Sequence, residues 1–391
     1  MNSASSSPPG TAHFSSLDSL RGLAALLVAI YHVNWIDPLR ELRLIHNAPL
    51  MVDLFFVLSG FVICYSYGDR LGNGRGFASF IWTRLGRLYP LHFVTLLVFA
   101  AWHVSKVERG MDGMEGNSAA SFVSNLFLVQ SMGLHDRMSF NYPSWSISTE
   151  LYAYVLFGLV VLATGNGWAR VLTSAVIVIT SVAILGGVSH MPLQQASVDL
   201  GYFRCLAGFF TGVLTCHIWR GARDRIAIAP GVGRVITPVL LIILALFVCL
   251  LPPNTMNGYA LLVLIPAVIL ALTLAPTPAV SAILNAKPLV WLGKISYSVY
   301  MVHAALLLLA GVVLSKGLRV PLLHETDPPL FMTTQLQGTL ALIVYLAVLL
   351  GVSSLTYRWI EEPFRERSKR AAARWWRGTA RTKSSAASLA S

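Results

Sequence analysis

Ten long apolar segments constrain what this chain can fold into. They lie near residues 17–36, 50–68, 88–104, 145–164, 171–189, 200–219, 235–252, 258–275, 295–314 and 336–357. Most are close to the roughly 20 residues that an α-helix needs to cross a bilayer. Only 12% of the residues are charged, against roughly 25% in a soluble domain. The sequence therefore predicts an all-α, polytopic integral membrane protein with about ten transmembrane helices.

The basic residues predict how these helices are oriented. If the N-terminus is cytoplasmic, the cytoplasmic loops and the C-terminal region hold 20 Lys and Arg residues, and the outer loops hold 7. Cytoplasmic loops carry the excess of Lys and Arg in membrane proteins, so we expect both termini to lie inside. The net charge of +12 is explained in the same way, and it does not indicate nucleic-acid binding.

The two ends of the chain differ in composition from the apolar region. Residues 1–16 are rich in Ser and Pro, and we predict a disordered N-terminal tail there. Residues 17–367 are predicted to form one transmembrane domain. Residues 368–391 read as a disordered, basic cytoplasmic tail, which can rest on anionic lipid headgroups. The segment 121–134 is too short and too polar to span, and we expect it to be interfacial or re-entrant.

The first span carries two side chains that are costly inside a membrane. His32 follows Arg21 by eleven residues, which places both on one helix face, about 16 Å apart along the axis. Ionisable residues within a bundle face its interior or a water-filled cavity, and they mark functional sites. We therefore expect Arg21 near the cytoplasmic end of a site and His32 nearer its outer end.

Three further ionisable residues are predicted at a depth similar to that of His32. Asp53 and Glu150 lie near the starts of spans that enter from outside, and Arg204 lies near the outer start of another. One interpretation is a functional cluster that includes His32. The alternative is that Asp53 and Glu150 only pair with Arg204 as structural ion pairs.

Two arginines precede the third span on the cytoplasmic side. Arg84 and Arg87 are three residues apart in "WTRLGRLYPLH", so they share a face at the predicted helix N-terminus. A helix N-terminus with two arginines suits phosphate binding. The alternative is simple anchoring at the cytoplasmic surface, which this stretch alone favours.

Six stretches together resemble a known family. In chain order they are "LDSLRGLAALLVAIYH", "VDLFFVLSGFVI", "TRLGRLYP", "PSWSISTELYAY", "LGKISYSVYMVH" and "WIEEPFRER". Over residues 17–367 the chain is similar to the acyltransferase 3 family of membrane-bound O-acyltransferases, which modify bacterial surface polysaccharides, Nod factors and some antibiotics. The resemblance implies a bacterial inner-membrane enzyme. It would move an acyl group, most commonly acetyl, from cytoplasmic acyl-CoA to a carbohydrate or glycoconjugate hydroxyl at the outer side. No bound cofactor or metal is implied.

The resemblance also implies roles for particular residues. The Arg-x10-His pair that marks the family falls on Arg21 and His32, the donor-associated arginines fall on Arg84 and Arg87, and the family's glutamate falls on Glu150.

Two departures from the family pattern accompany this match. "LDSLRG" stands for the common "LDGLRG", and Leu151 stands where many members have a second acidic residue. Glu150 would therefore serve alone.

The chemistry of O-acyl transfer assigns tasks to these residues. A hydroxyl must be deprotonated, and imidazole is the natural base near neutral pH. We predict that His32 is this base and that Glu150 or Asp53 orients it. The alternative is that His32 first takes the acyl group covalently.

The remaining candidates are less specific. Tyr297, Tyr300 and His303 on the ninth span are expected to pack between helices or to line the donor channel, and Arg204 could contact the tip of a succinyl donor. A secondary transporter with a buried His/Asp/Glu/Arg relay is the alternative function, but the sequence has no internal repeat to support it. The His-x4-Asp match in "HVNWID" is interpreted as chance, because the two side chains point about 140° apart on a helix.

Overall fold

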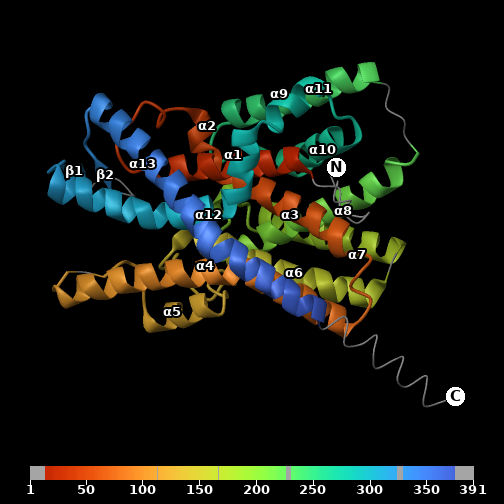
Figure 1. Cartoon of the computed structure of the whole chain (residues 1–391), viewed down its shortest axis with the longest axis horizontal. Coiled ribbons are helices and arrows are strands. Elements are labelled where there is room, and N and C mark those ends of the chain that lie inside the picture. Colours follow the sequence, from red (N-terminus) through yellow and green to blue (C-terminus); the bar gives the residue numbers. More distant parts are fainter. Residues whose placement is uncertain (1–13, 112, 166, 226–229, 324–328, 375–391) are drawn as a thin grey trace, which may run out of the picture.

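The computed structural model describes residues 14–111, 113–165, 167–225, 230–323 and 329–374. Within these ranges the fold is helical apart from one short two-stranded sheet (Figure 1). The helices are α1 (Ser15–Tyr31), α2 (Arg43–His46), α3 (Met51–Tyr67), α4 (Gly74–Glu108), α5 (Ala119–Leu126), α6 (Trp145–Thr164), α7 (Trp168–Val182), α8 (Gly201–Ala222), α9 (Pro230–Leu250), α10 (Leu261–Leu274), α11 (Pro278–Leu284), α12 (Lys287–Val312) and α13 (Gln335–Thr356), and the strands are β1 (Leu322–Leu323) and β2 (Leu330–Phe331).

All ten predicted spans are helices in the structure. Among the described residues, eight helices are long and apolar enough to cross a membrane. The two remaining predicted spans are α1 and α8, which carry Arg21 and the buried Arg204. Their polar residues face neighbouring helices, which lowers the cost of placing them in a bundle. The protein is thus an all-α, multi-pass membrane protein, as predicted.

Helix α1 runs parallel to α12 at the centre of the bundle. Ser15 donates to Asn285 at one end, and His32 meets His303 at the other. Between these ends the two helices touch at glycines. A Cβ atom on Gly22 of α1 would lie only 2.7 Å from the backbone nitrogen of Gly293 on α12. Small residues allow such close helix contacts in membranes. Successive spans cross the membrane in alternating directions, so the first and ninth spans are expected to run in the same direction, as they do.

Helices α3 and α8 form a second parallel pair. Glycines again lie at the crossing, where a Cβ atom on Gly60 would overlap the carbonyl oxygen of Phe209. An ion pair joins the two helices at each end. Asp53 pairs with Arg204 at one end, and Asp69, two residues after the end of α3, pairs with Arg220 at the other. These two helix pairs position most of the side chains that the sequence analysis singled out.

Helix α4 begins much earlier than the predicted third span. It starts at Gly74, where the side chain of Asn73 accepts a hydrogen bond from the backbone of Gly76. The prediction that Arg84 and Arg87 sit at a helix N-terminus is therefore wrong, because both lie inside a continuous helix. Pro90 lies inside α4 and does not mark its start. Helices in membrane bundles tolerate such an internal proline.

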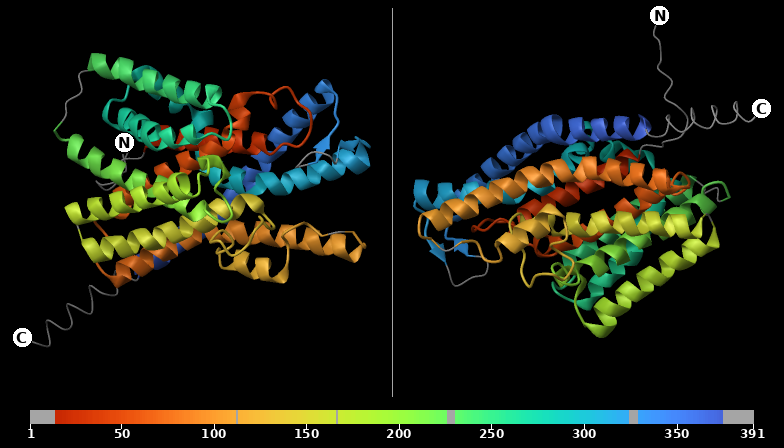
Figure 2. Two further views of the ribbon diagram at one scale, coloured as in Figure 1. Left: turned by 180° about the vertical axis from the view of Figure 1, so that it is seen from behind. Right: turned by 90° about the horizontal axis from the view of Figure 1, so that it is seen from below.

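The C-terminal region also differs from the prediction. After α13 the chain forms a π-helical turn, Tyr357–Glu361, and continues as a helix over residues 362–374, called here the terminal helix. This helix lies alongside α4 (Figures 1 and 2), and its Ser368 and Ala372 are buried. Residues 368–374 are thus not a disordered tail, because packing against α4 orders them.

The predicted boundaries at the two termini can be compared only in part. Phe14 packs against the rings of Phe61, Tyr65 and Trp219, so the folded part begins a little before the predicted start at residue 17. The rest of the predicted N-terminal tail, residues 1–13, and residues 375–391 lie outside the described residues. The predicted interfacial segment 121–134 overlaps α5, an eight-residue helix that begins at Ala119 and is too short to span.

Candidate active site

A cavity that contains several charged and hydroxyl side chains lies between α1, α3, α4, α6 and α12. Its volume is about 70 Å³, room for several water molecules. The lining includes six of the residues that the sequence singled out, together with hydroxyl groups of neighbouring helices. The six are Arg21, Arg84, Arg87, Glu150, Tyr297 and Tyr300. Residues that are more than 200 positions apart in the chain therefore meet in one site.

Glu150 is held by two hydroxyl groups inside this cavity. Its Oε1 accepts hydrogen bonds from the Oγ of Ser59 at 2.6 Å and from the hydroxyl of Tyr154 at 2.5 Å. The two hydroxyls are themselves 2.9 Å apart. Both bonds go to one carboxylate oxygen, so the other has no recorded partner among the described residues.

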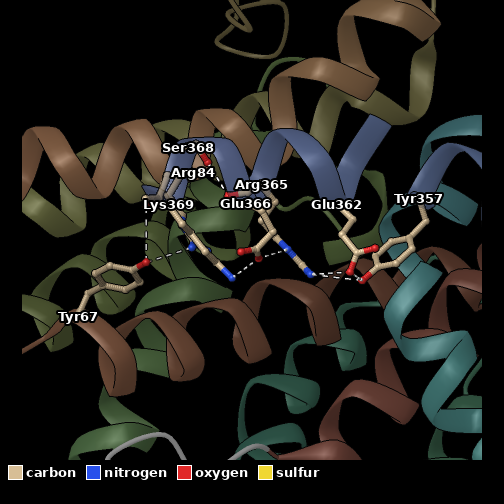
Figure 3. A network of polar contacts seen from close by, with 9 residues as sticks. Tyr67, Arg84, Tyr357, Glu362, Arg365, Glu366, Ser368 and Lys369 are labelled. Atoms are coloured by element: carbon tan, nitrogen blue, oxygen red, sulfur yellow. Dashed lines mark hydrogen bonds and ion pairs between the residues drawn. The ribbon is translucent and has the colours of Figure 1, made fainter. Parts of the chain in front are cut away.

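The three arginines of the cavity differ in how they are held. Arg21 donates to Asp18 at 3.3 Å. Arg84 donates to the hydroxyl of Tyr67 at 3.2 Å and stacks over its ring (Figure 3), but its Nε is buried without a partner. Arg87 has no hydrogen bond or ion pair with any described residue. Guanidinium groups with free donors beside a cavity are suited to binding an anion.

His32 lies at the C-terminal end of α1 and pairs with a second histidine. Its Nδ1 is 2.8 Å from the carbonyl oxygen of Val28 and 3.2 Å from Nε2 of His303. The Nδ1 of His303 is 2.6 Å from the carbonyl oxygen of Tyr300. Tyr300 lines the cavity and its ring contacts His303, so this tyrosine connects the arginine-lined cavity to the histidine pair.

The two backbone carbonyls determine the tautomers of both rings. A carbonyl oxygen only accepts, so the Nδ1 atoms of His32 and His303 must carry the protons when the rings are neutral. Nε2 of His303 is then an acceptor for the N–H of His32. It follows that Nε2 of His32 carries the free lone pair and is the atom able to take a proton or an acyl group.

Asp53 and Arg204 form a closed structural pair instead of contributing to the cavity. Nε and Nη2 of Arg204 donate to the two carboxylate oxygens of Asp53 at 2.9 and 2.8 Å, and both side chains are fully buried. The remaining N–H groups of Arg204 donate to the carbonyls of Pro49, Gln194 and Ala196. All of its donors are engaged, so Arg204 has none left for a substrate.

The predicted cluster around His32 is therefore only partly assembled. The structure does not bring Glu150 or Asp53 to His32, because Glu150 bonds to Ser59 and Tyr154, and Asp53 bonds to Arg204. The sequence analysis left open, as an alternative, that Asp53 only forms a structural ion pair with Arg204, and the structure shows this pair. The partner of His32 is His303, which the sequence analysis had placed in a channel or a packing role.

Several residues of the site were missed from the sequence. Tyr154 follows Glu150 by four residues and so shares its helix face, a signal that was available. Ser59 had no such signal, because its place opposite Glu150 depends on how α3 and α6 pack.

Tyr297, which the sequence analysis did name, donates to the carbonyl oxygen of Leu88 and so joins α12 to α4.

Comparisons with known proteins agree with this picture. Residues 14–358 match the profile of a family described as "Acyltransferase domain". The chain is 29% identical over 330 residues to the acyltransferase MdmB of Streptomyces mycarofaciens, covering 76% of this chain and 79% of that protein. It is 25% identical over 377 residues to the peptidoglycan O-acetyltransferase OatA of Listeria monocytogenes serovar 1/2a, covering 90% of this chain but only 56% of OatA. No solved structure matches the chain.

Fold and site together define a multi-pass membrane protein with a buried, arginine-lined cavity beside a histidine pair. The family match covers most of the described residues and therefore identifies the class of this protein. The chain belongs to this acyltransferase family, and the protein is an acyltransferase.

Proposed function

We propose that this enzyme transfers an acetyl group from cytoplasmic acetyl-CoA to a hydroxyl of a carbohydrate or glycoconjugate at the outer side of the bacterial inner membrane. The observation that carries the proposal is that Tyr300 lines the cavity that holds three arginines and also packs against the histidine pair. Relatives named for O-acetyl transfer to peptidoglycan support the acetyl group and the carbohydrate acceptor.

The cavity supports an acyl-CoA donor. Arg84 and Arg87 offer unpaired guanidinium N–H groups, and the donor carries phosphates that such groups bind well. A volume of about 70 Å³ suits the thin thioester end of the donor, while the nucleotide end would stay at the mouth. The distribution of basic residues supports a cytoplasmic position for this mouth.

The histidine pair supplies the base. The acceptor hydroxyl gives its proton to Nε2 of His32, its oxygen bonds to the thioester carbon, and the C–S bond breaks to release CoA as a thiolate that then takes a proton. Val28 and His303 both accept from Nδ1 of His32, which stabilises the imidazolium that forms. The alternative route, in which Nε2 first bonds to the acetyl carbon, uses the same free atom.

The function is tested on the cell surface and on the purified protein. A deletion strain should lose O-acetyl groups from a surface glycan by mass spectrometry, and the intact gene should restore them. Incubating the purified enzyme with radiolabelled acetyl-CoA in the absence of acceptor distinguishes the two routes, because only the covalent route leaves label on His32. Unchanged glycan acetylation in the deletion strain, together with no binding of acetyl-CoA, would refute the proposal.

Arg84→Ala and Arg87→Ala should each weaken binding of acetyl-CoA by roughly 10- to 100-fold, the cost of one charge-assisted contact of about 1.5–3 kcal/mol. The two variants differ in one respect, since the loss of Arg84 also removes the hydrogen bond to Tyr67, whereas Arg87 makes no hydrogen bond with a described residue. Equilibrium binding of radiolabelled acetyl-CoA measures this. Arg220→Ala, in an ion pair outside the cavity, is the matched control and should leave binding unchanged. Equal affinity in all three variants would place the donor elsewhere.

His303→Asn should lower kcat by about 10- to 100-fold while leaving the affinity for acetyl-CoA unchanged. Asparagine reaches only the position of Nδ1 and cannot accept from His32. His303→Gln carries an amide oxygen near the position of Nε2, so it should recover much of the lost kcat. A purely structural role predicts instead that both variants lose thermal stability and that glutamine gives no rescue.

A further inference from the structure

The terminal helix has one face that is buried along its whole described length. Glu361, the residue immediately before this helix, is buried, as are Ser368 and Ala372 within it, and Arg365 is half-buried on the same face. Spacings of four, three and four residues form a single stripe on an α-helix. The opposite side exposes Arg367, Lys369 and Arg370, among others. This segment is therefore docked on the protein through a specific face.

The docking contact lies on α4 beside the cavity arginines. Gly86 is one residue before Arg87 and two after Arg84. A Cβ atom on Gly86 would lie 2.3 Å from both Cβ and Oγ of Ser368, so the two helices can approach only because residue 86 is glycine. Figure 3 shows the same region, in which Ser368, Arg365 and Lys369 lie on the terminal helix and Arg84 bonds to Tyr67.

A buried carboxylate immediately before the terminal helix acts electrostatically on Arg87. Glu361 is buried, accepts a hydrogen bond from Ser298 at 3.0 Å and interacts electrostatically with Arg87. It ends the π-helical turn Tyr357–Glu361, and such turns are frequent at functional sites because they redirect a side chain. Arg87 makes no hydrogen bond to this carboxylate, so its donors stay available while the nearby charge holds it in place.

We propose that the terminal helix is a positioning element of the donor site. The contact between Ser368 and Gly86 fixes the height and rotation of α4, and Glu361 holds Arg87 toward the cavity. Arg84 and Arg87 are thereby preorganised for the phosphates of acyl-CoA. This inference rests on the proposed role of the two arginines in donor binding. A displacement of about 1 Å can lower the rate of a reaction in a preorganised site roughly 100-fold, so small shifts of α4 matter here.

The test uses size exchange at the contact. Gly86→Ala should weaken binding of radiolabelled acetyl-CoA to the full-length protein by roughly 10- to 100-fold. Adding Ser368→Gly removes both atoms that clash with the new methyl group, so the double variant should regain affinity. Adding Ser368→Ala instead keeps the clashing Cβ, so this matched double variant should stay weak. Ser368→Gly alone measures the cost of losing the contact itself.

Further measurements keep the outcome decisive. Glu361→Gln keeps the shape and the bond to Ser298 but removes the charge, so it should also weaken acetyl-CoA binding without lowering the melting temperature of the protein. Normal affinity in Gly86→Ala and in Glu361→Gln, or equal affinity in the two double variants, would overturn the inference. If the wild-type protein itself does not bind acetyl-CoA, the proposed function fails before the variants are compared, so the two failures are distinguishable.

Discussion

Replacing His32 with alanine should lower the rate of acyl transfer by roughly 100- to 10,000-fold, the usual contribution of a positioned general base. Nε2 of His32 is the free lone pair of the histidine pair, because Nδ1 is committed to Val28 and His303. Acetyl-CoA should still bind with near wild-type affinity, since the cavity arginines are unaffected. Single-turnover transfer and equilibrium binding, measured on one preparation, check both parts.

His92→Ala is the matched control for this prediction. His92 is another buried histidine, on α4, and its Nε2 is 2.8 Å from the carbonyl oxygen of Asn125, outside the cavity lining. Its loss should affect stability more than turnover. Full transfer activity in purified His32→Ala would end the catalytic role of His32, and an equal loss in both variants would show that the effect is not specific to the site.

The positions of the helices could be predicted because the membrane imposes one strong rule on the sequence. Apolar stretches of about 20 residues become helices, since the bilayer interior offers no other partner for backbone groups. This rule says nothing about helices that continue beyond an apolar stretch. The first part of α4 and the terminal helix are polar enough to read as a loop and a tail, and contacts such as Gly86 with Ser368 order them.

The sequence singled out several of the residues that line the cavity, but not how they pair. The shared face of Arg84 and Arg87 is a local property of one helix, and both do line the cavity. The supposed pairing of Glu150 with His32 was based on depth alone. Depth does not specify the position of a helix around the bundle, and the packing of α3 and α6 turns Glu150 to Ser59 instead. The pairing of His32 with His303 depends in the same way on the glycine crossing of α1 and α12.

Asp53→Asn should lower the free energy of unfolding by about 3–5 kcal/mol, because it leaves the Arg204 guanidinium buried without its counter-charge. Both side chains are fully enclosed, and the carboxylate accepts two of the arginine's hydrogen bonds. The protein that does fold should keep near-normal turnover, since neither residue lines the cavity. Thermal melting of the detergent-solubilised protein and its single-turnover rate measure the two effects.

Asp69→Asn provides the matched control at the other end of the same pair of helices. Its ion pair with Arg220 has a 3.0 Å separation, close to that of the buried pair, but the Asp69 side chain is 58% exposed. Exposed pairs contribute about 0–1 kcal/mol, so this variant should melt almost as the wild type does. The difference between the two variants isolates the effect of burial. If Asp53→Asn instead melts normally and loses turnover, Asp53 acts in catalysis, and the closed pair with Arg204 must open during the reaction.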